Sequence, residues 1–154
     1  MSIKLKVVVI DDMKILADNL CSVILENENV EEVYTEYNGE DGLISILNNE
    51  PDIVFTDNQM PCRTGIEFIE ELQHYQFEQM PKLVLVTADN DIELIRKSQE
   101  LGFELVHKPI SDRRVFEIIE EVANTESDIK TREQEQKIEV KKENFFTRIF
   151  NKNK

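Results

Sequence analysis

The stretch Ile53-Val54-Phe55-Thr56-Asp57-Asn58-Gln59-Met60-Pro61 decides the fold that this sequence predicts. A short apolar run ends in the carboxylate of Asp57, and polar residues and a proline follow at once. The pattern predicts a buried strand that ends at Asp57, after which the chain leaves the sheet in a loop. Because ligands of open parallel sheets bind beyond the carboxyl ends of the strands, Asp57 is a candidate functional residue.

Four further apolar runs predict strands, over residues 5–10, 33–37, 83–87 and 103–107. Between and after the five runs, apolar residues recur at helical spacing. Thr64 and Ser111 are suited to begin two of these helices, and Gly102 is suited to end another. Five strands that alternate with five helices indicate an α/β fold, a doubly wound five-stranded parallel sheet with helices on both faces.

The composition indicates one compact domain, residues 1–124, followed by a charged tail, residues 125–154. The sequence contains no apolar run long enough to span a bilayer, and its start lacks a signal-peptide pattern. We therefore expect a cytoplasmic protein, in which Cys21 and Cys62 are free thiols. The net charge of −14 argues against nucleic acid as a direct partner.

The charge is distributed unevenly along the chain. Residues 125–154 carry eight Lys/Arg and six Asp/Glu, a net charge of +2, which leaves −16 on residues 1–124. Residues 141–154 alone carry +4. An acidic body with a basic end is the main compositional asymmetry of the chain.

Polar residues follow four of the five predicted strands. Asp11 and Asp12 follow the first strand, Asp57 the third, Thr87 the fourth and Lys108 the fifth. All strands of a parallel sheet end at the same edge, where three carboxylates would repel one another. A hard cation such as Mg²⁺ removes that conflict and leaves room for a phosphoryl oxygen. One acid is then a candidate nucleophile toward a phosphoryl group, and the lysine and threonine are candidate ligands of its oxygens.

Taken singly, each of these residues has a simpler interpretation, such as a helix cap for Asp12 or a surface charge for Lys108. Their combination over residues 4–124 resembles the receiver domain of bacterial two-component response regulators, the CheY-like family. The resemblance rests on Ile10-Asp11-Asp12, Thr56-Asp57-Asn58-Gln59-Met60-Pro61 with Gly65, Val86-Thr87-Ala88 and His107-Lys108-Pro109. It implies the flavodoxin-like strand order 2-1-3-4-5.

The resemblance also implies a role for each residue of the acidic edge. Asp57 is expected to be the phosphoacceptor. Asp12, Asp57 and the backbone carbonyl of Gln59 are expected to bind Mg²⁺, with Asp11 acting through a water molecule. Lys108 is expected to bind a phosphoryl oxygen.

Three further residues take roles by the same resemblance. Thr87 is expected to bind the phosphoryl group in the switched state, and the small Ala88 lets the backbone approach it. The bond before Pro109 is expected to be cis. The chain departs from the family at Leu105, where an aromatic residue usually reports the movement of the threonine.

We therefore predict a phosphorylation-dependent signalling module that takes a phosphoryl group from a histidine kinase or phosphotransfer protein. Such a module catalyses only its own phosphorylation and dephosphorylation, and it acts through a downstream protein or passes the group on. A constitutive docking domain is the alternative that Leu105 favours. A Mg²⁺-dependent phosphohydrolase with an aspartyl nucleophile is disfavoured. Such enzymes need a second acid two residues after the nucleophile, and this chain has Gln59 there.

The tail, residues 125–154, is predicted to be helical or disordered up to Glu143. Beyond it, four apolar residues fall on one face of a possible helix, and Lys and Arg surround them: Phe145, Phe146, Ile149 and Phe150. Three sites for burial of this face remain open, namely an anionic membrane, a partner protein and the acidic body. We favour protein docking, on a partner or on a second copy, because single weak membrane anchors bind marginally.

Overall fold

Five parallel strands form one sheet in the computed structural model, which describes residues 2–152. The order β2-β1-β3-β4-β5 confirms the flavodoxin-like arrangement predicted from the sequence. Of the predicted basic end, Lys154 lies outside the described residues. The strands are β1 Leu5–Ile10, β2 Val30–Glu36, β3 Ile53–Asp57, β4 Lys82–Thr87 and β5 Glu104–His107.

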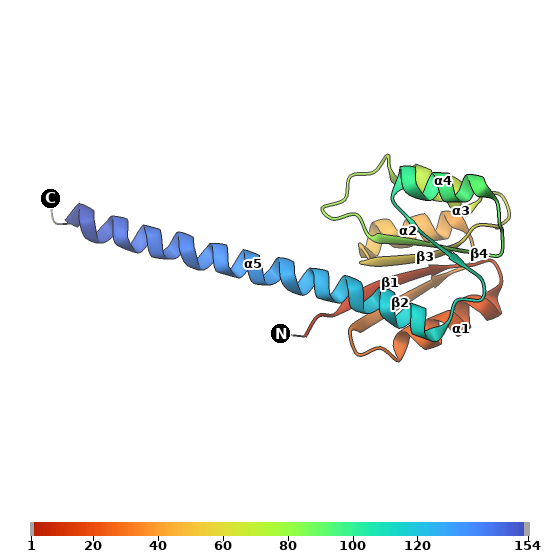
Figure 1. Ribbon diagram of the computed structural model, residues 1–154, viewed down its shortest axis with the longest axis horizontal. Helices are drawn as coiled ribbons and strands as arrows, with labels where there is room; N and C mark the ends of the chain where they lie inside the picture. The colour runs from red at the N-terminus through yellow and green to blue at the C-terminus, as the bar shows by residue number, and fades with distance from the viewer. Residues whose placement is uncertain (1, 153–154) are drawn as a thin grey trace.

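Helices cover both faces of the sheet (Figure 1). Helices α1 and α5 pack on one face, and α2, α3 and α4 pack on the other. Residues on alternate sides of β1 belong to different cores, with Val7 and Val9 in the first and Val8 and Ile10 in the second. The helices are α1 Lys14–Leu25, α2 Gly39–Asn49, α3 Gly65–Leu72, α4 Ile92–Leu101 and α5 Asp112–Lys152.

Local signals in the sequence explain where several helices begin and end. Thr64 and Glu67 form a capping box at the start of α3. The hydroxyl of Ser111 accepts a hydrogen bond from the amide of Arg114, 3.1 Å away, in the first turn of α5. Gly102 ends α4 in the left-handed conformation, with φ of 73°. These three predicted helix ends are therefore confirmed.

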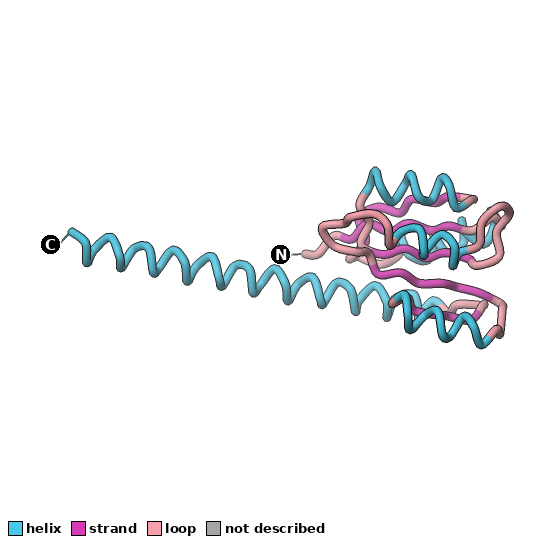
Figure 2. Tube along the Cα trace, turned by 90° about the horizontal axis from the view of Figure 1, so that it is seen from above, coloured by secondary structure: helices cyan, strands magenta, loops and turns pink. Residues whose placement is uncertain are grey.

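Helix α5 is 41 residues long and extends far beyond the sheet (Figures 1 and 2). Its buried residues, Val115, Ile118, Ile119 and Ala123, lie in the first three turns and pack on the core. Every residue from 127 to 152 is exposed to solvent. The tail is thus helical, and it continues α5 without a break at the predicted domain limit near residue 124.

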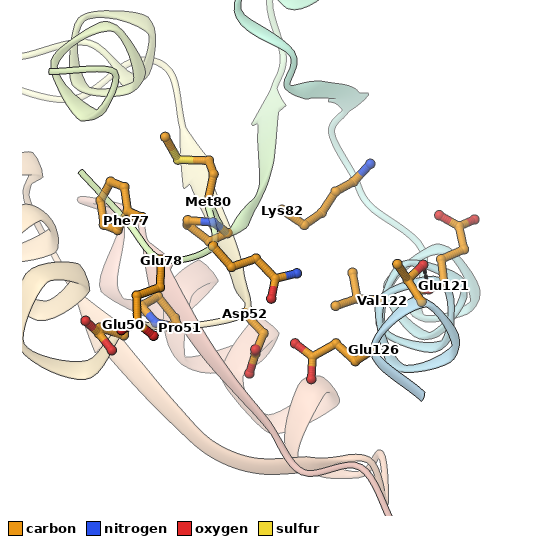
Figure 3. A pocket seen from close by; sticks show the side chains of 13 residues that line it. Glu50, Pro51, Asp52, Phe77, Glu78, Met80, Lys82, Glu121, Val122 and Glu126 are labelled. Carbon is orange, nitrogen blue, oxygen red and sulfur yellow. Dashed lines mark hydrogen bonds between the residues drawn. The ribbon is translucent and has the colours of Figure 1, made fainter. Parts of the chain in front are cut away.

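Residues 121–126 of α5 lie beside a cavity of about 470 Å³ at the amino ends of β3 and β4 (Figure 3). Glu126 of α5 faces Asp52, which precedes β3 and whose Oδ2 accepts a hydrogen bond from the amide of Lys6 at 2.8 Å. Burial, followed by a hydrogen bond to Asp52 and the charge of Asp52, raises the pKa of Glu126 to about 7, against a small opposing effect of Lys130. Other charged groups line the same cavity, namely Glu50, Glu78, Lys82 and Glu121.

We predict that Glu126→Gln stabilises the protein at about pH 8 and that the gain disappears at about pH 4. The pKa of Glu126 is higher in the folded state than its ordinary value of 4.5. Folding therefore opposes ionisation of this group, and stability is lost as the pH rises from the unfolded pKa through the folded pKa. Denaturant unfolding across this pH range measures the difference, with Glu133→Gln on the exposed part of α5 as the control. A gain that does not vary with pH would contradict the assignment.

Candidate functional site

The carboxyl ends of four strands bring the predicted site residues together at one edge of the sheet. Asp57 is the last residue of β3 and Thr87 is the last residue of β4. Asp11 and Asp12 follow β1 directly, and Lys108 follows β5. This edge lies opposite the cavity beside Glu126, so the two features are separated by the length of the strands.

Three carboxylates form a cluster at this edge. Asp11, Asp12 and Asp57 each offer an oxygen, and these oxygens lie within 4.8 Å of one another. Asp11 and Asp57 are buried and Asp12 is exposed. The Nζ atom of Lys108 lies 3.3 Å from Oδ1 of Asp57 and 3.3 Å from Oδ2 of Asp11. One ammonium group thus partly neutralises three negative charges.

The ionised form of Asp57 is disfavoured in this structure. Burial raises the pKa of its carboxyl, the nearby charge of Lys108 lowers the pKa, and the charge of Asp11 raises it again. The amide of Asn58 donates a hydrogen bond of 2.8 Å to Oδ1 of Asp57, which also favours the ionised form. The net result is a raised pKa, which shows that the lysine and the amide do not fully offset burial and repulsion.

The cluster fits a hard divalent cation. Its donors are carboxylate oxygens, the ligands that Mg²⁺ prefers, and an additional positive charge would remove the repulsion between Asp11 and Asp57. The exposed Asp12 leaves one side of the cluster open to water, and Mg²⁺ usually retains several water ligands. The residues present therefore suit Mg²⁺ better than a softer metal, which would select Cys or His.

A glycine lets α3 start directly against the site. A Cβ atom on Gly65 would collide with the backbone oxygen of Asp57 and would lie 2.6 Å from Cδ1 of Leu85. The amide of Gly65 donates to the backbone oxygen of Asn58 at 2.9 Å, and the amide of Ile66 donates to Oδ1 of Asn58 at 3.2 Å. The loop after Asp57 is thus held at both ends. Asn58 accepts both of these hydrogen bonds, a role that the sequence pattern did not indicate.

Thr87 and its neighbours at the end of β4 complete the site. The side chain of Thr87 is buried, and its Oγ1 accepts a hydrogen bond from the amide of Asp89 at 3.0 Å. Ala88 is exposed. The side-chain amide of Gln59 donates to Oδ2 of Asp89 at 3.0 Å, which links the loops after β3 and β4. The sequence analysis did not identify Asp89 as part of the site. Its position, an acid two residues after the end of a strand, could have indicated it.

Leu105 lies on β5 away from the carboxylates. It pairs with Leu85 in the register of β4 and β5, two residues before the pair of Thr87 and His107. Leu105 is half-buried and packs against the core beneath α2, α3 and α4. It therefore shares one side of the sheet with Thr87, but it is an aliphatic packing residue there.

Two further features adjoin the cluster. The peptide bond between Lys108 and Pro109 is cis, as predicted. A cavity of about 440 Å³ opens beside the cluster, between α1 and the start of α5, and it reaches Asp57 and Lys108. Apolar side chains of α1 and α5, among them Leu16, Leu20 and Val115, line much of this cavity. Asp57 thus lines an open, partly apolar cavity.

Known proteins match most of the chain. The family described as the response regulator receiver domain matches residues 7–120. Among solved structures, the N-terminal domain of an uncharacterized protein from Wolinella succinogenes is 25% identical, with a TM-score of 0.72, and the match covers 80% of this chain and 98% of that one.

Two further structures are similar in fold. A CheY-like receiver domain protein from Methanospirillum hungatei is 22% identical with a TM-score of 0.72, over 82% of this chain and 98% of that one. The chemotaxis response regulator CheY4 of Vibrio cholerae is 21% identical with a TM-score of 0.66, over 77% and 98%. In each case the match covers nearly all of the other chain and leaves part of this chain unmatched.

We predict that Mg²⁺ raises the melting temperature of the protein and that Asp12→Asn largely removes this effect. A ligand that binds only the folded state adds about 2.7 kcal/mol at one hundred times its dissociation constant. Asp12→Asn removes one charged oxygen donor from the exposed side of the cluster. Thermal unfolding with Mg²⁺ or with a chelator measures the shift, and Asp128→Asn on the exposed part of α5 is the control. An equal shift in both variants would exclude Asp12 as a ligand.

Proposed function

Since this chain belongs to the response regulator receiver domain family, we propose that it is a phosphorylation-dependent signalling module whose phosphoacceptor is Asp57. The phosphoryl donor is a histidine kinase or a histidine phosphotransfer protein. The observation that supports this proposal best is the position of Asp57, a buried carboxylate between two other acids and 3.3 Å from Lys108. An isolated carboxylate at a strand end would not need these neighbours.

The reaction transfers one phosphoryl group. A carboxylate oxygen of Asp57 forms the new bond to phosphorus, and the bond from phosphorus to the donor imidazole breaks, its electron pair returning to the ring nitrogen. Oδ1 of Asp57 already accepts the amide of Asn58 and faces Lys108, which leaves Oδ2 for the attack. The donor would approach Asp57 from the solvent side of the cluster, where Asp12 is exposed.

Charge must be balanced during this transfer. Bound Mg²⁺ would supply positive charge against the carboxylates and the phosphoryl oxygens. Asp12, Asp57 and the backbone carbonyl of Gln59 would hold the ion, and Asp11 would act through a bound water molecule. Lys108 exchanges its contact with the free carboxylates for a contact with a phosphoryl oxygen.

The response to phosphorylation involves Thr87. Its hydroxyl, now bound by the amide of Asp89, would turn to the phosphoryl group, and the exposed small residue Ala88 would leave the backbone free to approach. Breaking the bond to Asp89 also affects Gln59, because Asp89 holds its side chain. The surface around β4, α4 and β5 thereby shifts between two populations, which a downstream protein partner distinguishes.

A constitutive docking domain is the second candidate, and Leu105 favours it. Leu105 packs in the core and has no aromatic ring to exchange between a buried and an exposed position. In that case phosphorylation would have little effect on the partner surface. The phosphohydrolase alternative has less support, because Gln59 stands where such enzymes need a second acid.

We predict that Asp57 alone is labelled by acetyl phosphate, and only with Mg²⁺. Asp57 combines burial, a raised pKa and the neighbouring lysine, whereas Asp12 is exposed. Intact-protein mass spectrometry should show one added phosphoryl group on the parent and none on Asp57→Asn. Labelling of the Asp57→Asn protein, or undiminished labelling in excess chelator, would refute the assignment.

We predict that Leu105→Tyr enlarges the response to phosphorylation. A tyrosine ring can leave the core and present its hydroxyl to solvent, while leucine gains nothing from exposure. Hydrogen exchange of β5 with and without the phosphoryl mimic beryllofluoride measures the response. We expect a small change in the parent and a larger one in Leu105→Tyr, within the usual coupling range of about 1–3 kcal/mol. The same change in both proteins would show that this position does not carry the switch.

A further inference from the structure

The end of α5, residues 144–152, which we call the tip, carries an unpartnered aromatic face. Phe145, Phe146, Ile149 and Phe150 are spaced i, i+1, i+4 and i+5, so they share one side of the helix. Their exposed fractions lie between 42% and 71%. The rings of Phe145 and Phe146 contact each other edge to face, with centroids 6.0 Å apart. Four large apolar side chains thus lie in solvent on one short segment.

Positive charge accompanies this face. The sequence has no Asp or Glu after Glu143, while Arg148 and Lys152 lie within the tip. Lys141, Arg148 and Lys152 are spaced i, i+7 and i+11, which places them on one stripe beside Phe145 and Ile149. The opposite side of the tip carries the uncharged residues Asn144, Thr147 and Asn151. The tip therefore has an aromatic face with a cationic stripe along the side of Phe145 and Ile149.

Residues 127–143 form the part of α5 that we call the stalk. The aromatic face of the tip does not continue along the stalk. Ile138 lies in line with Phe145, but Ile129 is nine residues before Ile138 and so lies on the opposite side, and Val140 is also turned away. A coiled coil needs an apolar seam that repeats every seven residues, and the stalk lacks one. The stalk is thus a spacer, which separates Phe145 from the last buried residue, Ala123, by about 33 Å.

We propose that the tip binds the surface of an anionic phospholipid membrane. The end of a helix with aromatic side chains on one face and Lys and Arg beside them binds at a membrane interface, with its rings among the upper acyl chains. None of the described helices is both long and apolar enough to cross a membrane, so the tip rests on one surface. The sequence alone led us to favour docking of the tip on a protein, so a membrane surface is a different binding partner from the one predicted there.

The stalk gives the reason for this choice. Residues 1–124 carry a net charge of −16, so an anionic surface repels the body of the protein. Charges are largely screened beyond about 8–10 Å at physiological salt. When α5 is inclined to the surface, the helix between Ala123 and Phe145, about 33 Å long, holds much of the acidic body beyond this distance while the cationic tip makes contact. Docking of the tip on a protein groove would require no such separation.

A second copy of the chain is the competing occupant. Its acidic cavity near Glu126 is lined by Phe77, Met80 and Val122 as well as carboxylates, and it could accept a cationic aromatic segment. Binding there would be a reciprocal association of two chains and would depend on protein concentration. Binding to lipid would depend on the lipid composition instead, which makes the two occupants distinguishable.

Co-sedimentation of the full chain with vesicles tests the proposal. We expect the bound fraction to increase with the phosphatidylglycerol content of phosphatidylcholine vesicles and to decrease with added salt. Phe150→Asp should weaken binding about tenfold or more, because it removes a large apolar side chain and adds a repelled charge. Val140→Asp, a matched control at a side chain 55% exposed on the other side of the helix, should change binding no more than about twofold.

Three results would overturn the proposal. The first is equal binding to vesicles with and without phosphatidylglycerol. The second is an equal loss of binding in Phe150→Asp and Val140→Asp. The third is an absence of binding to anionic vesicles, and a tip-dependent dimer in sedimentation velocity would then assign the tip to a second copy. Phosphorylation of Asp57 by acetyl phosphate, equal in all variants, shows that each of them is folded.

Discussion

The convergence of three carboxylates at one edge of the sheet is the constraint on which the site depends. Asp11 and Asp57 are buried together, and Lys108 lies 3.3 Å from both, yet the pKa of Asp57 is still raised. Such an arrangement is unfavourable unless the rest of the fold holds it in place. Both faces of the sheet are covered, and Gly65 allows α3 to start against Asp57. The fold thus holds the carboxylates close together, and their mutual repulsion favours the binding of a cation.

The fold and the central site follow from short-range patterns in the sequence. Buried strands such as β1 and β3 are continuous apolar runs, and parallel topology then places Asp57, Thr87 and Lys108 at one edge. The contact between Asp52 and Glu126 could not be predicted, because it joins residues distant in sequence through the packing of α5. The helical state of residues 125–143 was also undecided, because a charged segment without an apolar face is compatible with helix and with disorder.

Charged contacts and core packing attach helix α5 to the body. Arg114 forms ion pairs with Glu104 of β5 and with Glu117 and Glu121 of its own helix. Five residues beyond Glu121, Glu126 lies beside Asp52, at the edge of the sheet opposite the carboxylate cluster. A movement of β5 would therefore strain contacts of α5, whose first three turns belong to the core. The exposed stalk begins only where these contacts end.

The tip gains its helical form from this attachment. An isolated helix of nine residues is marginal in water, because the first turn fixes several dihedral angles for a single hydrogen bond. In α5 that cost is met by the turns that pack Val115, Ile118 and Ile119 against the sheet, and the helix then propagates outward. Phe145 and its neighbours are consequently arranged on one face before anything binds them. A preformed face loses less conformational freedom on binding than a disordered segment would, which compensates in part for its small area.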